Sequence, residues 1–161
     1  MKNKIIIFLM LVIVLLISQV SLAEKFDQNK LQNLNYKEKI MYIADVKNIK
    51  LLDKATNENY PFYISEGILN IYAKTNQNTE LDILRDTEIF LKPLSNSNNL
   101  PNSVLFIWKG TILDKYGNES LGNIMIFEIT KKDLQKINWD NFYYGDLPQF
   151  DPYYYIHKDL K

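Results

Sequence analysis

The chain has 161 residues, and its 19 basic and 19 acidic side chains give a formal net charge of zero. This balance argues against a general binder of nucleic acid or anionic membrane, which would carry a clustered basic excess. The absence of cysteine excludes disulfides, lipid attachment to a cysteine and cysteine-based catalysis. The core must therefore rest on apolar packing alone, which a chain of this length can supply.

The first 23 residues have the layout of a secretory signal peptide. A basic start precedes an apolar run over residues 5–17, and the small residues Ser21 and Ala23 occupy positions −3 and −1 before a cleavage site after Ala23. The run is shorter than the about 20 residues of a membrane-spanning helix, which favours cleavage over a retained anchor. We expect an exported protein, periplasmic or extracellular, that meets the membrane only through this segment before cleavage. Its mature part is expected to be a single domain over residues 24–161.

Residues 24–39 are polar and are expected to form a flexible lead-in or a short helix that uses Leu31 and Leu34. The apolar residues that follow fit either a helix or a strand, because periodicity does not settle short mixed runs. We favour a strand over residues 44–52. The composition of residues 55–59 predicts a turn.

The middle of the chain is predicted to be rich in strands. Extended segments are expected at residues 61–65, 67–74 and 80–92, and apolar residues alternate with polar ones in the last two. Such alternation marks a strand with one buried face. A polar surface loop is predicted over residues 95–102.

Two apolar runs, at residues 104–108 and 124–129, flank a turn region that contains Gly117 and Gly122. Because glycine can take positive φ, this pattern predicts an antiparallel β-hairpin. The first run is apolar on both faces, as in a central strand covered on both sides.

Thr130, with Asp133 three residues later, predicts the N-terminus of a short helix over residues 131–138. The glycine and prolines of residues 139–161 predict a mostly irregular tail. The predicted fold class is therefore α+β, mainly β. We expect a small antiparallel sheet or partly open barrel of about five strands, with one late helix packed on it.

Aromatic and acidic residues are densest in the tail. Tyrosine rings give a large contact area at low entropic cost and keep a hydroxyl for hydrogen bonding. The expected binding patch consists of Tyr143, Tyr144, Asp146, Asp151, Tyr153 and Tyr154. The alternative is that these rings pin the tail to the sheet, because an unpinned tail would be disordered. In an extended segment the consecutive tyrosines at 153–155 would point to alternating sides.

The sequence shows no catalytic or metal-binding motif. His157 is the only histidine, and without a second histidine or a thiolate no zinc or copper site is expected. A serine triad would depend on His157 as its base, and no nucleophile-elbow pattern surrounds the serines. One segment contains three closely spaced carboxylates, Asp82, Asp86 and Glu88. We interpret them as the solvent-facing side of a strand and not as a catalytic pair.

We therefore expect a small exported, non-catalytic binding protein of the bacterial cell envelope that uses no cofactor. Its partner is expected to be another protein, in an inhibitor or immunity-type role, and not a nucleic acid. One alternative is a module that binds carbohydrate or cell wall. A further alternative is a hydrolase that uses Asp82 or Glu88.

Overall fold

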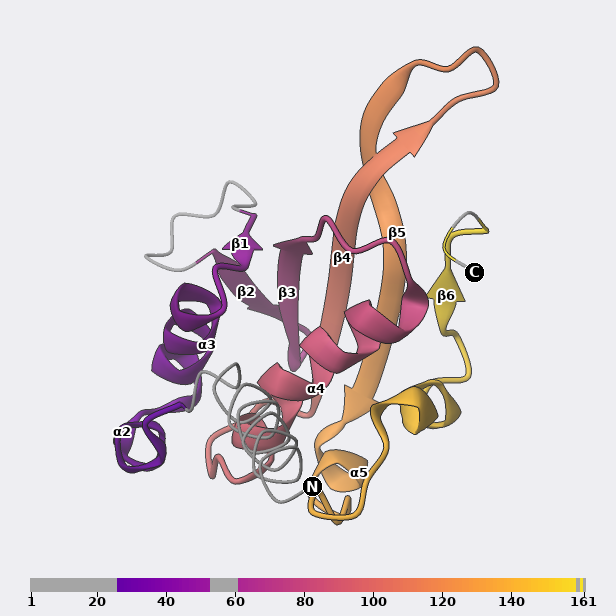
Figure 1. The fold of residues 1–161 in the computed structure, drawn as a ribbon. Coiled ribbons are helices and arrows are strands. Elements are labelled where there is room, and N and C mark those ends of the chain that lie inside the picture. Colours follow the sequence, from indigo (N-terminus) through magenta and orange to yellow (C-terminus); the bar gives the residue numbers. More distant parts are fainter. Residues whose placement is uncertain (1–25, 53–60, 159, 161) are drawn as a thin grey trace, which may run out of the picture.

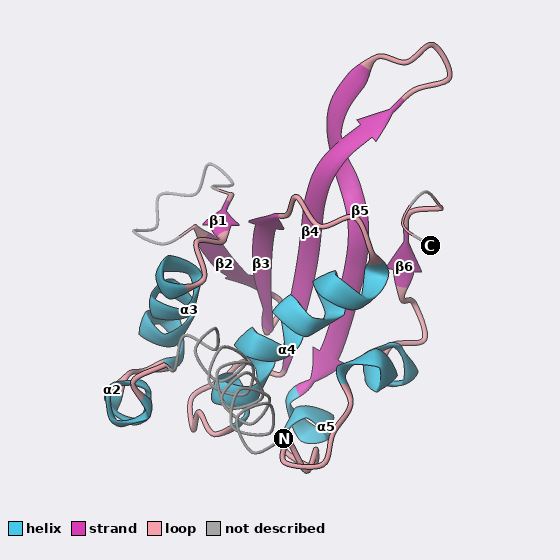
Figure 2. Cartoon of the chain, in the orientation of Figure 1, coloured by secondary structure: helices cyan, strands magenta, loops and turns pink. Residues whose placement is uncertain are grey.

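The computed structural model describes residues 26–52, 61–158 and 160, so the predicted signal peptide and the predicted turn at residues 55–59 lie outside it. The described residues form an open, six-stranded sheet with helices against one face (Figure 1, Figure 2). The strands are β1 (Lys50–Leu51), β2 (Phe62–Ser65), β3 (Ile68–Lys74), β4 (Ser103–Leu113), β5 (Glu119–Thr130) and β6 (Tyr155–Ile156). The helices are α2 (Gln28–Asn33), α3 (Tyr36–Val46), α4 (Glu80–Ser95), α5 (Lys131–Leu134) and the 3-10 helix η1 (Tyr144–Phe150).

The sheet has the order β1-β3-β4-β5-β6, and β2 pairs with β3. The predicted fold class, α+β with substantial strand content, is confirmed. The sheet is mixed because β3 and β4 run parallel, whereas the other pairs are antiparallel. Parallel neighbours need a crossover connection, and α4 supplies it.

Helix α4 replaces the strand predicted over residues 80–92, and that prediction is wrong. Thr79 caps the helix, since its Oγ1 accepts a hydrogen bond of 3.2 Å from the backbone N–H of Asp82. The buried side chains of α4 recur at the helical spacing of three to four residues; they are Ile83, Leu84, Thr87, Phe90, Leu91, Leu94 and Ser95. Of the residues that suggested alternation, Thr87 and Leu91 belong to this buried set, whereas Ile89 is only partly buried.

The strand predicted over residues 44–52 is also mostly wrong, because α3 continues to Val46 and only Lys50–Leu51 is extended. Asn35 starts α3 with a capping box: its Oδ1 accepts a hydrogen bond of 3.1 Å from the N–H of Glu38. The side chain of Glu38 accepts one of 2.9 Å from the N–H of Asn35 in return. The short helix expected in the lead-in is confirmed as α2, with Leu31 buried.

The predicted hairpin is confirmed, with β4 and β5 paired from Ser103 and Thr130 to Leu113 and Glu119. Thr130 caps α5 as predicted, and its Oγ1 accepts a hydrogen bond of 3.1 Å from the N–H of Asp133. Helix α5 ends earlier than expected, and α4 is the main helix on the sheet. No helix in the described part of the chain is long and apolar enough to cross a membrane.

The core lies between α4 and the adjacent face of the sheet. The ring of Phe90 packs on Phe106 and Trp108 of β4, at centroid distances of 5.5 and 6.4 Å. The Nε1 of Trp108 donates a hydrogen bond of 2.9 Å to the Oγ1 of Thr87 on α4. Because side chains alternate along a strand, Ile107, which lies between Phe106 and Trp108, points to the opposite face with its cross-strand neighbours Tyr72 and Ile126.

Candidate functional site

Two residues of the predicted tail patch attach the tail to the body of the protein. Asp151 is buried, and its carboxylate accepts hydrogen bonds of 2.7 Å from the N–H of Glu128 and 2.8 Å from the N–H of Tyr153. Tyr154 is half-buried and donates a hydrogen bond of 2.8 Å to the carboxylate of Glu80 on α4. The pKa of the Tyr154 hydroxyl is well above its ordinary value, mainly because the group is removed from solvent and also because of this hydrogen bond.

The other residues of the patch lie at the surface. Tyr143 is 52% exposed, and its ring lies 4.8 Å from that of Tyr144 at the start of η1. Asp146 accepts a hydrogen bond of 3.0 Å from Gln149. Tyr153, next to β6, is 88% exposed. The consecutive tyrosines do alternate: Tyr154 faces inward and its two neighbours outward.

The sheet face opposite α4 forms a second candidate surface. No helix of the described residues packs on it (Figure 2). The register places four apolar or aromatic residues in one row across β3 to β6; they are Tyr72, Ile107, Ile126 and Tyr155. Strand β4 is a central strand, as predicted, and on this second face Ile107 is only 8% exposed although no described helix covers it.

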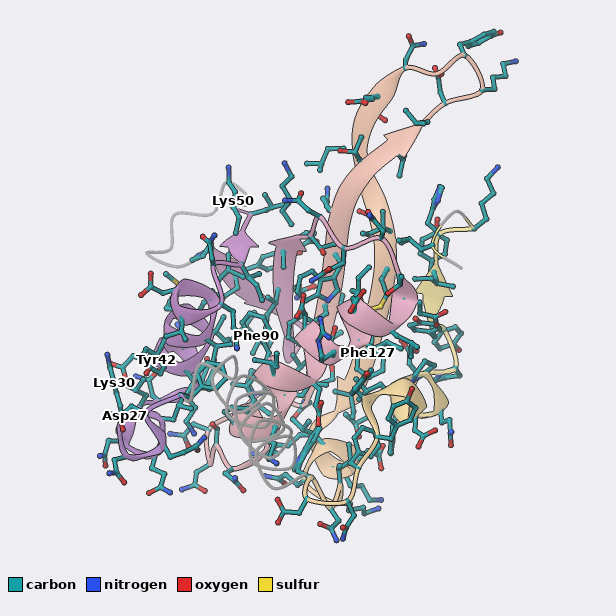
Figure 3. All side chains as sticks on the ribbon, in the orientation of Figure 1. Asp27, Lys30, Tyr42, Lys50, Phe90 and Phe127 are labelled. Carbon is teal, nitrogen blue, oxygen red and sulfur yellow. The ribbon has the colours of Figure 1, made fainter. Side chains whose placement is uncertain are left out.

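A row of lysines lies next to this apolar row. Lys50 of β1, Lys74 of β3 and Lys109 of β4 are direct cross-strand neighbours and therefore point to the same face. We call Lys50, Lys74 and Lys109 the lysine row. Lys50 lies at the end of the sheet from which β4 and β5 extend outward (Figure 3).

Beyond the lysine row, β4 and β5 continue as a two-stranded ribbon that projects from the molecule (Figure 1). The last cross-strand partner of β3 on β4 is Lys109, and β6 reaches no further along β5 than Met125. Residues 110–113 and 119–123, which we call the ribbon, therefore pair only with each other. Three large exposed side chains lie on the ribbon and its tip: Leu113 (60% exposed), Tyr116 (76%) and Leu121 (52%).

The ribbon has local features that hold its shape. A Cβ atom added to Gly122 would lie 2.3 Å from the Cδ1 of Ile112, so the Ile112 side chain lies across this glycine. At the tip, Asp114 accepts hydrogen bonds of 2.8 Å from the N–H of Tyr116 and 2.9 Å from the N–H of Asn118. Side chains alternate along a strand, so Leu113 points to the same face as Lys109, four residues earlier in β4. Leu121 of β5 lies opposite Thr111, which is also on this face, so both leucines share the face of the lysine row.

A cavity of about 600 Å³ lies on the helix side, lined by Phe26 and by residues of α2, α3 and α4 that include Leu31, Lys39 and Glu88. The Nζ of Lys39 donates hydrogen bonds of 3.2 Å to the carbonyl of Pro93 and 3.1 Å to the Oγ of Ser97. Burial lowers the pKa of Lys39 and raises that of Glu88.

The carboxylates considered for a hydrolase do not converge. Asp82 and Glu88 are six residues apart on α4, which separates them by about 9 Å along the axis and about 120° around it. The Oδ1 of Asp82 lies 3.0 Å from the guanidinium of Arg85. No group of three or more possible metal-binding side chains occurs within residues 26–52 and 61–158.

Comparisons with protein families, with curated proteins and with solved structures found no match for this chain. The sequence analysis missed both the lysine row and the leucines of the ribbon. The signal available was Leu113 and Leu121 within an otherwise polar turn region.

Proposed function

We propose that this protein is a non-catalytic binding protein that acts after export and holds another protein against its open sheet face and ribbon. The observation that carries the proposal is the continuity of this surface. An apolar row of the sheet, the lysine row and the exposed leucines of the ribbon follow one another on one face. Tyr72 and Ile107 are nearly buried within the row, so its exposed part consists of Ile126, which is partly exposed, and Tyr155, which is 42% exposed. Exposed apolar side chains gathered on one face mark interaction sites in soluble proteins.

The side-chain chemistry favours a protein partner over a glycan. Leu113 and Leu121 are aliphatic and more than half exposed, and such side chains add apolar contact area in protein interfaces. A sugar-binding surface would instead present several aromatic rings for stacking, and among the row Tyr72, Ile107, Ile126 and Tyr155 only Tyr155 is largely exposed.

The ribbon supports an inhibitor-type or immunity-type role. Its strands leave outer edges without a strand partner in the described residues, and such edges can pair with an extended segment of a partner. The hydrogen bonds of Asp114 fix the tip before binding, which reduces the entropy lost on binding. The proposal of export rests on the predicted signal peptide. The proposal of a non-catalytic role rests on the sequence, which shows no catalytic motif.

Site-specific photo-crosslinking in the intact envelope of the source cell tests this proposal. A photoreactive phenylalanine analogue replaces Leu121 in the ribbon or, as a control, the exposed Lys132 of α5. We expect one dominant crosslinked protein from position 121 and none from position 132. Equal products from both positions, or none from 121, would contradict the proposal.

A further inference from the structure

We infer that the partner presents an acidic polypeptide segment, flanked by apolar residues, to the lysine row. The inference rests on the proposed function and specifies the chemistry of the partner. The observation behind it is the direct cross-strand register of Lys50, Lys74 and Lys109. Neighbouring strands lie about 4.8 Å apart, so three positive charges are held close together on one face.

This arrangement is unfavourable in the isolated protein, because like charges directly opposite one another destabilise a strand pair. None of the three lysines forms an ion pair with another described residue. The Nζ of Lys109 lies 5.9 Å from the centre of the Tyr72 ring.

The nearest carboxylates placed on this face by the register are those of Glu119 and Glu128. Each lies two side-chain rows from the lysine row, which corresponds to about 13 Å along the strands. Such a separation exceeds the Debye length of about 8 Å at physiological ionic strength, so neither carboxylate neutralises the lysines. A negatively charged ligand would relieve this local repulsion.

The surroundings indicate which anionic ligand fits. Ile126 and Tyr155 lie in the row on one side, and Leu121 and Leu113 lie on the ribbon on the other. An acidic stretch of polypeptide with apolar residues at both ends matches this order of charges and apolar groups. An anionic polysaccharide could pair with the lysines but has no counterpart for the aliphatic side chains.

Backbone-amide NMR titration of the full chain tests the inference with defined probes. The first probe is a short synthetic peptide with a central Glu-Asp-Glu segment flanked by leucines. The second carries Gln-Asn-Gln at the centre, and the third is an oligogalacturonate of equal charge. We expect the acidic peptide to shift the amides of Lys74, Lys109 and Leu121 and to bind about tenfold more weakly to K74E/K109E. The variant K132E should bind it like the wild type.

Three results would overturn the inference. The neutral peptide could bind this face as tightly as the acidic one, which would leave the proposed function standing with a different partner chemistry. The oligogalacturonate could bind at least as tightly as the acidic peptide, which would make the ligand a glycan. Neither peptide could shift this face, in which case the crosslinking at position 121 decides the proposed function separately.

Discussion

Asp151 reaches from the tail to the C-terminal end of β5, where its Oδ2 accepts a hydrogen bond of 2.7 Å from the backbone N–H of Glu128. Its Oδ1 accepts a second one from the N–H of Tyr153. One buried carboxylate therefore satisfies a strand-edge donor and fixes the turn that leads into β6. The tail is attached here by a polar side chain as well as by aromatic rings.

Replacement of Asp151 by alanine should destabilise the protein, because it leaves the N–H of Glu128 without its partner. We expect a loss of about 1–3 kcal/mol in the free energy of unfolding, measured by urea denaturation. D151N keeps one acceptor oxygen and should lose less. The matched surface variant D146A should unfold like the wild type, and wild-type stability of D151A would show that the tail does not depend on this bond.

The Oγ1 of Thr87 accepts a hydrogen bond from Nε1 of the buried Trp108, which is the only polar atom of that side chain. T87V keeps the shape of the side chain but removes the acceptor, so the indole N–H is left unpaired in the core. We expect a loss of about 1–3 kcal/mol in unfolding free energy. T87S keeps the acceptor and loses one methyl group, which should cost about 0.8 kcal/mol. Equal unfolding free energies of T87V and the wild type would show that the hydrogen bond between Thr87 and Trp108 does not stabilise the fold.

The raised pKa of Tyr154 predicts a specific alkaline sensitivity. The folded protein retains the Tyr154 proton above its ordinary pKa of 10.0, whereas the unfolded chain releases it there. Stability contributed by this group is therefore full below about pH 10 and is lost as the pH rises above that value.

The variant Y154F removes both the hydrogen bond to Glu80 and this titration. At neutral pH it should be less stable by about 1 kcal/mol, and the difference from the wild type should shrink above about pH 10. Urea unfolding of both proteins at neutral pH and above about pH 10 measures this difference in unfolding free energy. Y153F, which alters a ring 88% exposed, serves as the control and should match the wild type at both. A Y154F difference independent of pH would contradict the assignment.

The ribbon leucines should matter for binding and not for folding. Leu113 and Leu121 are 60% and 52% exposed, so L113S/L121S should change the unfolding free energy by no more than about 0.5 kcal/mol. I112S should be more damaging, because Ile112 packs across Gly122 within the ribbon. Thermal unfolding of both variants checks this, and a large loss in the leucine variant would assign those residues to the fold.

The elements predicted correctly from the sequence are those with local signals. The hairpin of β4 and β5 has apolar strands around a glycine-containing turn, and Thr130 with Asp133 forms a cap from adjacent residues. Residues 80–92 were misassigned because Thr87, Ile89 and Leu91 fit a strand as well as a helix. The deciding contact, between Phe90 and β4, is tertiary.

The candidate site was harder to predict than the fold. Lys50, Lys74 and Lys109 become neighbours only through the register of β1, β3 and β4, and α4 separates the last two along the chain. The tail patch was suggested by composition, which does not distinguish Tyr154, bonded to Glu80, from the exposed Tyr153. Binding of a partner by Tyr143, Tyr144 and Asp146 stays a prediction from the sequence, and it is the alternative to binding at the ribbon.

The most direct test is the affinity of L113S/L121S for the protein crosslinked at position 121, measured beside Y143A. Tyr143 is 52% exposed, as Leu121 is, but it belongs to the tail and not to the ribbon. The account predicts that the double variant weakens binding by about tenfold or more while Y143A leaves it unchanged. Unchanged affinity of the double variant with weakened binding of Y143A would contradict it and place the binding surface on the tail.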